Sequence, residues 1–130
     1  MADKIAELSI NGNQPRVDIS ITQPDNLPRG RFQIILYDSN KRNPILVGEE
    51  RNDVANPNGN FPIPRQLSQL DDCWLWFRAS IADPNGIPQR WFLRVKIIQD
   101  GQVVDGGNYI KEATFDSFAR IHDEVRLNVS

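Results

Sequence analysis

Apolar and polar side chains alternate in several short segments of this chain, which is the pattern of a β-strand with one buried face. In residues 16–22, Val17, Ile19 and Ile21 alternate with polar residues. Further strand-like segments lie at 31–38, 73–82, 90–99 and 124–129, with weaker ones at 44–48, 60–64, 102–104 and 108–115. Turns rich in Asn, Asp, Pro and Gly separate them. This spacing predicts roughly eight strands in an all-β fold, a single antiparallel β-sandwich domain over residues 1–130.

Two segments are candidates for a short helical turn. Residues 63–72 place Leu67 and Leu70 three positions apart, and residues 116–124 begin with a possible N-cap, Asp116, before an apolar stripe. Neither segment is long enough to change the all-β class.

The alternation also predicts which face of each strand lies in the core. In the segment 73–82 the odd positions carry no polar side chain, whereas the even positions include Arg78, whose charge must reach water. The predicted core therefore contains Cys73, Leu75, Phe77, Ala79 and Ile81 from this segment, Trp91, Leu93, Val95 and Ile97 from the next, Val17, Ile19 and Ile21, Phe32, Ile34 and Leu36, and Val125, Leu127 and Val129.

The outward residues of two consecutive segments predict a surface patch. The connection DPNGIP at 83–88 favours an antiparallel hairpin between 73–82 and 90–99, with Phe77 opposite Val95. Trp76 would then lie near Lys96, and Arg78 near Arg94. The predicted binding residues are Trp74, Trp76, Arg78, Phe92, Arg94 and Lys96.

Three interpretations of this aromatic and basic patch stay open. Cations stacked on indoles stabilise a strand ladder without any ligand, and another part of the chain could cover the rings. Trp, Phe and Arg are also enriched where proteins contact each other, which predicts a protein partner or a homo-oligomer. Flat indoles such as Trp74 and Trp76 also stack on sugars, so a carbohydrate-binding module, with Arg78 and Gln89 taking hydroxyls, is the alternative.

Catalytic signatures are absent from the sequence. The single histidine, His122, shares its parity with outward residues, and on a strand Asp123 would point to the opposite face, so the pair cannot act as a dyad. No GxSxG, Walker or GxGxxG motif occurs. We expect no enzyme activity, no catalytic residues and no cofactor.

No metal site is predicted, although two loop clusters leave calcium open as a ligand. One histidine and one cysteine exclude a zinc cluster within the chain. Two loop clusters supply hard oxygen ligands, but Asn and Asp are also ordinary turn residues and neither cluster has EF-hand spacing. These clusters are Asp100, Asp105 and Asn108, and Asn52, Asp53 and Asn58.

Composition and charge limit the classes of binding partner and indicate the cellular compartment. The net charge of −2 argues against nucleic acid, and no apolar run approaches the ~20 residues that span a bilayer, so no membrane partner is expected. The N-terminal residues carry charges and lack the apolar stretch of a secretory signal. The lone Cys73 is expected to be a buried, inert thiol and fits a reducing compartment, so we expect a cytoplasmic protein.

A short motif resembles a known class of β-sandwich. The segment NPNGNFPIP at 56–64 ends a turn in Gly-Asn-Phe and is followed by the strand-like CWLWFRASI at 73–81. This is similar to immunoglobulin-like and transthyretin-like sandwiches, in which a G-x-F turn precedes a strand with alternate residues in the core. The resemblance implies the fold and carries no function. The aromatic and basic face and the absence of catalytic signatures lead us to expect a non-enzymatic interaction module for protein contact or self-association.

Overall fold

The computed structural model describes residues 4–22, 29–82, 89–115 and 118–130. These residues form nine strands and one 3₁₀ turn. The strands are β1 (Ile5–Leu8), β2 (Arg16–Thr22), β3 (Arg29–Tyr37), β4 (Ile45–Val54), β5 (Asn58–Pro62), β6 (Trp74–Ala82), β7 (Gln89–Gln99), β8 (Gln102–Phe115) and β9 (Phe118–Val129).

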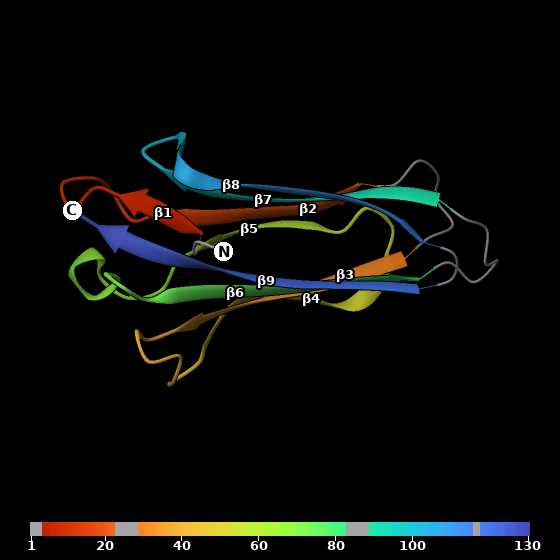
Figure 1. The fold of residues 1–130 in the computed structure, drawn as a ribbon, viewed down its shortest axis with the longest axis horizontal. Helices are drawn as coiled ribbons and strands as arrows, with labels where there is room; N and C mark the ends of the chain where they lie inside the picture. The colour runs from red at the N-terminus through yellow and green to blue at the C-terminus, as the bar shows by residue number, and fades with distance from the viewer. Residues whose placement is uncertain (1–3, 23–28, 83–88, 116–117) are drawn as a thin grey trace.

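Two sheets pack face to face, as the sequence predicted (Figure 1). Sheet A has the strand order β1-β9-β6-β3-β4, and sheet B has the order β5-β2-β7-β8. Neighbouring strands are antiparallel, except that β1 runs parallel to the end of β9. The all-β sandwich is therefore confirmed, and the parallel pairing of β1 with β9 was not predicted.

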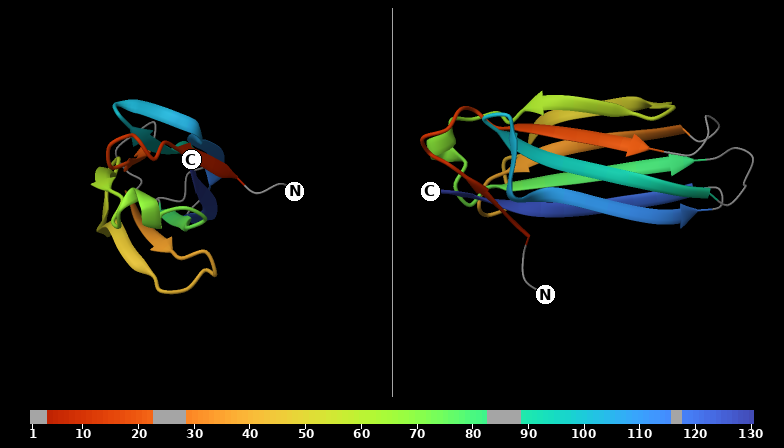
Figure 2. Two further views of the ribbon diagram at one scale, coloured as in Figure 1. Left: turned by 90° about the vertical axis from the view of Figure 1, so that its left-hand side faces the viewer. Right: turned by 90° about the horizontal axis from the view of Figure 1, so that it is seen from above.

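The two sides of the sandwich are closed differently. On one side the chain passes from β4 in sheet A to β5 in sheet B, and these strands pack together. On the other side β1 pairs with the last residues of β9 and also packs against β8 of sheet B. The view from above shows β1 at the end of the sandwich that holds the C-terminus (Figure 2). β1 thus bridges the sheets over only part of the length of this side.

The core between the sheets contains nearly all the predicted residues, and it also contains Ala6, Leu8, Ile63 and Leu70, which the alternation did not predict. Trp91, Leu93, Val95 and Ile97 of β7 are buried, and so are Cys73 and the odd-numbered residues of β6. The inward residues of β2 and β3 complete the centre, together with Val125 and Leu127 of β9, while Val129 is only half-buried. Alternation identified these residues because a strand sends successive side chains to opposite faces.

The predicted hairpin between residues 73–82 and 90–99 is wrong. β6 pairs with β3 and β9 in sheet A, whereas β7 pairs with β2 and β8 in sheet B. Phe77 lies opposite Ile34 and Asp123, and Val95 lies opposite Ile19 and Tyr109. Two consecutive strands can bury their apolar faces either as partners in one hairpin or as members of two facing sheets. In this chain β6 and β7 lie in facing sheets.

The two helical candidates have different outcomes. Residues Leu67–Gln69 form a 3₁₀ turn within the first candidate. The second candidate is wrong over its described part, since Phe118 and the residues after it belong to β9. Asp116 lies outside the described residues. Pairing with β6 supplies backbone hydrogen bonds along the whole segment. These hydrogen bonds stabilise the extended conformation more than the weak helical propensity of the segment stabilises a helix.

Candidate functional site on the outer face of sheet A

The six predicted binding residues lie on two opposite faces of the sandwich. Trp74, Trp76 and Arg78 stand on the outer face of sheet A, because Leu75 and Phe77 between them are buried. The other three, Phe92, Arg94 and Lys96, alternate with the buried residues of β7 and stand on the outer face of sheet B. The single patch predicted from sequence therefore does not exist, and the two halves are separate surfaces.

Register places the outward residues of sheet A in rows that cross the strands. One row runs Tyr37, Trp74 and Arg126, and the next runs Leu46, Ile35, Trp76 and Glu124. The third contains Glu49, Gln33, Arg78 and His122, and the fourth contains Arg31, Ser80 and Arg120. The face thus changes from aromatic at one end to arginine-rich at the other.

Both tryptophans of this face are covered by cations. The Lys41 ammonium lies 4.2 Å from the centroid of a Trp74 ring, and it also forms an ion pair with Glu124 at 2.6 Å. The Arg78 guanidinium lies 5.4 Å from a Trp76 ring centroid. Each such contact contributes about 0.5–1 kcal/mol at an exposed site. The aromatic end is therefore stabilised by the chain's own side chains.

The arginine-rich end surrounds a shallow hollow of about 650 Å³. Ser80 is the small residue between Arg31 and Arg120, and Arg78 lies two residues before it on the same strand face. We call this surface the arginine hollow. Its lining comprises Arg31, Phe32, Gln33, Ile35, Pro44, Leu46, Glu49, Glu50, Arg51, Arg78, Ser80 and Arg120.

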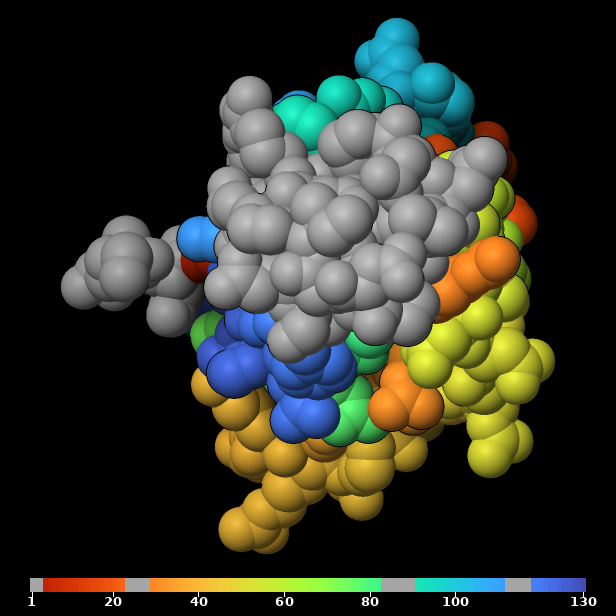
Figure 3. All heavy atoms as spheres, turned by 90° about the vertical axis from the view of Figure 1, so that its right-hand side faces the viewer, coloured from red at the N-terminus to blue at the C-terminus, as the bar shows by residue number. Residues whose placement is uncertain are grey.

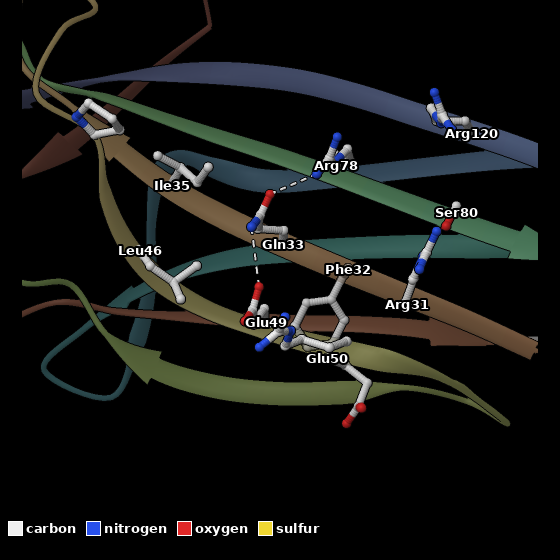
Figure 4. A pocket seen from close by; sticks show the side chains of 12 residues that line it. Arg31, Phe32, Gln33, Ile35, Leu46, Glu49, Glu50, Arg78, Ser80 and Arg120 are labelled. Carbon is white, nitrogen blue, oxygen red and sulfur yellow. Dashed lines mark hydrogen bonds and ion pairs between the residues drawn. The ribbon is translucent and has the colours of Figure 1, made fainter.

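Gln33 separates the positive and negative parts of the hollow (Figure 4). Arg78 donates a hydrogen bond of 2.9 Å to the Gln33 side-chain oxygen, and the Gln33 amide donates one of 3.2 Å to Glu49. Glu49 also lies 3.5 Å from Arg51. The carboxylate of Glu49 is thereby engaged on β4 and does not reach Arg78 directly.

Two exposed apolar side chains flank the hollow. Leu46 of β4 is 51% exposed and Phe118 of β9 is 54% exposed, and Arg120 lies over the Phe118 ring at 5.6 Å. The end view shows the start of β3, the end of β6 and the start of β9 side by side at this rim (Figure 3). Apolar side chains with arginines between them are the composition of a protein contact surface.

A second, smaller hollow of about 400 Å³ opens between the sheets beside β1. Phe77, Val95 and Val125 line it, and Lys4, Tyr109 and Asp123 form a polar cluster at its rim. Lys4 forms an ion pair with Asp123 and lies 4.7 Å from the Tyr109 ring centroid. This cluster was missed from sequence, although Asp123 shares the inward parity of Val125.

The rim cluster shifts two pKa values in opposite directions. Burial, together with the charge of Asp123, raises the pKa of Tyr109 to about 12. Burial also opposes ionisation of Asp123, but the Lys4 ammonium, the Glu124 backbone N–H and the Tyr109 hydroxyl outweigh it and lower the pKa of the carboxyl. The cluster therefore favours an ionised Asp123 beside a neutral Tyr109.

We expect these shifts to appear in the pH dependence of stability. The lowered pKa of Asp123 contributes stability above its unfolded value of 3.8, which is lost as the pH falls through the folded value. The raised pKa of Tyr109 contributes stability below its unfolded value of 10.0, which is lost as the pH rises toward 12. The Tyr109 contribution should be about 1 kcal/mol, because the hydroxyl is only partly buried and water screens its interactions.

Urea unfolding at a series of pH values measures these contributions. In Tyr109→Phe the loss of stability between pH 9 and pH 12 should be about 1 kcal/mol smaller than in the original chain. Asp123→Asn should similarly flatten the acid limb. Equal alkaline limbs in Tyr109→Phe and the original chain would contradict the assignment.

The other chemistry-bearing groups are ordinary structural residues. Cys73 is buried, its thiol lies 3.3 Å from the Gln69 carbonyl oxygen, and burial raises the pKa of the thiol. His122 is exposed on the outer face opposite Arg78, and Asp123 points to the other face, as predicted. Asp100 accepts hydrogen bonds from the backbone and side chain of Asn13.

Neither a metal cluster nor a membrane span is found in the described parts of the chain. No group of three or more His, Cys, Asp or Glu residues there is arranged to hold an ion. Likewise, no helix among the described residues has the length and apolar character needed to cross a bilayer.

Comparison with known proteins adds little to this geometry. No family model and no curated protein matches the chain. Among solved structures, the chain is similar to a domain of unknown function, DUF4425, from Bacteroides vulgatus, with 13% identity, a TM-score of 0.41, and coverage of 88% of this chain and 96% of that chain. So distant a likeness says nothing about function. The narrower immunoglobulin-like or transthyretin-like class stays a prediction.

Sequence reasoning missed the residues that surround Ser80. Arg31 carries the outward parity of its predicted strand, whereas Arg120 lies in the segment 116–124, which the sequence predicted as a short helical turn. The missing information was that residues from Phe118 onward belong to β9 and that β3, β6 and β9 are neighbours, which brings Arg31, Ser80 and Arg120 into one row.

Proposed function

We propose that this protein is a non-enzymatic interaction module that binds another protein through the outer face of sheet A. The observation that carries the proposal is the arginine hollow flanked by Leu46 and Phe118. Arginine and exposed apolar side chains are enriched in protein contacts, and they stand here on rigid neighbouring strands. The face keeps half of the sequence-predicted site, namely Trp74, Trp76 and Arg78.

The carbohydrate alternative is weaker on this face. A sugar ring needs an open indole face to stack on, and here Lys41 lies over Trp74 while Arg78 lies over Trp76. These contacts favour a structural role for the indoles. The proposed partner therefore binds at the arginine-rich end of the face. The proposal keeps the cytoplasm as the compartment, because a lone buried thiol suits a reducing environment.

A photo-crosslinking experiment tests the proposal with a matched control. Leu46 on sheet A and Ile110 on sheet B are 51% and 55% exposed, so either can be replaced by benzoylphenylalanine without entering the core. In extract of the native host, the Leu46→benzoylphenylalanine chain should crosslink to a defined protein, and the Ile110→benzoylphenylalanine chain should not.

A charge reversal within each face completes the test. Adding Arg78→Glu to the crosslinking chain should abolish the product, and adding Arg94→Glu on sheet B should leave it unchanged. A product that survives Arg78→Glu, or equal products from both crosslinking positions, would contradict the proposed surface. A product of twice the chain's own mass would identify the partner as a second copy.

A further inference from the structure

The arginine hollow has the geometry of a seat for a carboxylate. Ser80 lies on β6 directly between Arg31 of β3 and Arg120 of β9. Neighbouring strands are about 4.8 Å apart, so the two arginines stand on either side of a small hydroxyl side chain. An anion above Ser80 can accept hydrogen bonds from both guanidiniums and from the serine hydroxyl.

The positive charge of this seat is only weakly compensated. Arg31 lies 3.8 Å from Asp53, and both side chains are 56% exposed, so water screens the pair. Within the described residues neither Arg78 nor Arg120 forms an ion pair: Arg78 donates to the neutral Gln33 and Arg120 lies over Phe118. The nearby Glu49 is engaged by Gln33 and Arg51. Three like charges on adjacent strands repel each other, and a bound anion removes that repulsion.

The remaining lining points to a polypeptide rather than a simple anion. Ile35, Pro44 and the exposed Leu46 form an apolar wall of the same hollow. A ligand that complements both the arginines and the apolar wall carries carboxylates at one end and an apolar side chain at the other, a combination that acidic protein segments have and sulfated sugars lack. Because the guanidinium fork matches a planar carboxylate, Glu or Asp side chains fit the arginines.

We infer that the arginine hollow binds an acidic segment of the partner protein, with a carboxylate over Ser80 and an apolar side chain several residues further along the segment against Leu46. This inference rests on the proposed function, whose surface it uses, and it specifies the chemistry of the partner. The segment crosses β6 and β3 and reaches β4 at Leu46. Its affinity falls as salt rises, since exposed charges supply much of the attraction.

Calorimetry with synthetic peptides tests the inference. The probes are a peptide of alternating glutamate and leucine, the same peptide with glutamine for glutamate, inorganic phosphate, and heparin as a sulfated polysaccharide. We expect the glutamate peptide to bind and the glutamine peptide to bind at least about tenfold more weakly. Backbone NMR shifts should concentrate at Ser80 and its neighbours on β3 and β9.

Variants separate the two halves of the hollow. Arg78→Gln combined with Arg120→Gln should weaken the glutamate peptide at least about tenfold, whereas Arg94→Gln on sheet B should not. Leu46→Ser should weaken the peptide and leave phosphate binding unchanged. Circular dichroism of every variant establishes that the sandwich is intact, which is expected because the replaced side chains are exposed.

The outcomes that overturn the inference differ from those that overturn the proposed function. Equal binding of both peptides, binding unaffected by the paired arginine substitution, or binding of heparin without the peptide would refute the acidic segment. If the glutamate peptide does not bind, but Arg78→Glu still abolishes the crosslinked product with the host protein, the acidic-segment inference is refuted and the proposed function stands. If the crosslink persists in Arg78→Glu, the proposed function falls even when the peptide binds.

Discussion

Replacing Trp91 by alanine should lower the free energy of unfolding by about 3–5 kcal/mol. Trp91 is fully buried near the start of β7, an inner strand of sheet B, and among the described residues it is the largest fully buried side chain. Its removal leaves a cavity that the two rigid sheets can close only in part, and the surrounding side chains lose their packing contacts. Since a domain of this size is stable by about 5–15 kcal/mol, much of the stability depends on this one residue.

Denaturant unfolding followed by circular dichroism measures this loss. Trp74→Ala is the matched control, because the same side chain is removed from the outer face, where it is only half-buried and contacts Lys41. The control should lose about 1 kcal/mol. Similar losses in the two variants would contradict the assignment of Trp91 to the core and Trp74 to the surface.

Replacing Gly106 by alanine should detach β1 from the sandwich and destabilise the fold by more than about 2 kcal/mol. Gly106 has a φ of +74°, a conformation that a Cβ disfavours by about 1–2 kcal/mol. The added Cβ would also overlap the carbonyl oxygen of Ile5, a backbone atom that can yield only if β1 moves. Both penalties act together at the point where β1 packs on β8.

Gly101→Ala separates the backbone strain from the overlap. Gly101 has a similar φ of +77°, but a Cβ there meets no atom within 4 Å, so only the conformational penalty should remain. Hydrogen exchange provides the local readout, because the Arg126 amide donates to the Lys4 carbonyl at 2.8 Å. In Gly106→Ala this amide should lose protection, and in Gly101→Ala it should keep it. Equal protection in both variants would show that the overlap is relieved without moving β1.

Strands were predicted well where they carry a long alternating pattern and poorly where neighbours define them. The segment 73–82 was recognised from its own residues, and so was 90–99. β1 was missed because its four residues are too few to show a pattern, and it is held in place by β9 and β8. The segment 116–124 has a weak helical pattern in the sequence, and its described part, from Phe118 onward, is a strand because it pairs with β6 over a long register.

By itself the sequence determined the class of the fold, most of the core, and the outward face of the strands that alternate clearly. These properties are local: alternation has a period of two residues, and burial of one face follows from each strand alone. It placed Leu75, Phe77 and Trp91 inside and Trp74, Trp76 and Arg78 outside. Only the tertiary structure decided which strands are neighbours, because pairing joins residues far apart in the chain and a buried face can be satisfied by several partners. Because β6 and β7 lie in different sheets, Arg94 stands on the surface opposite Arg78. Because β3 and β9 flank β6, Arg31 and Arg120 stand on either side of Ser80.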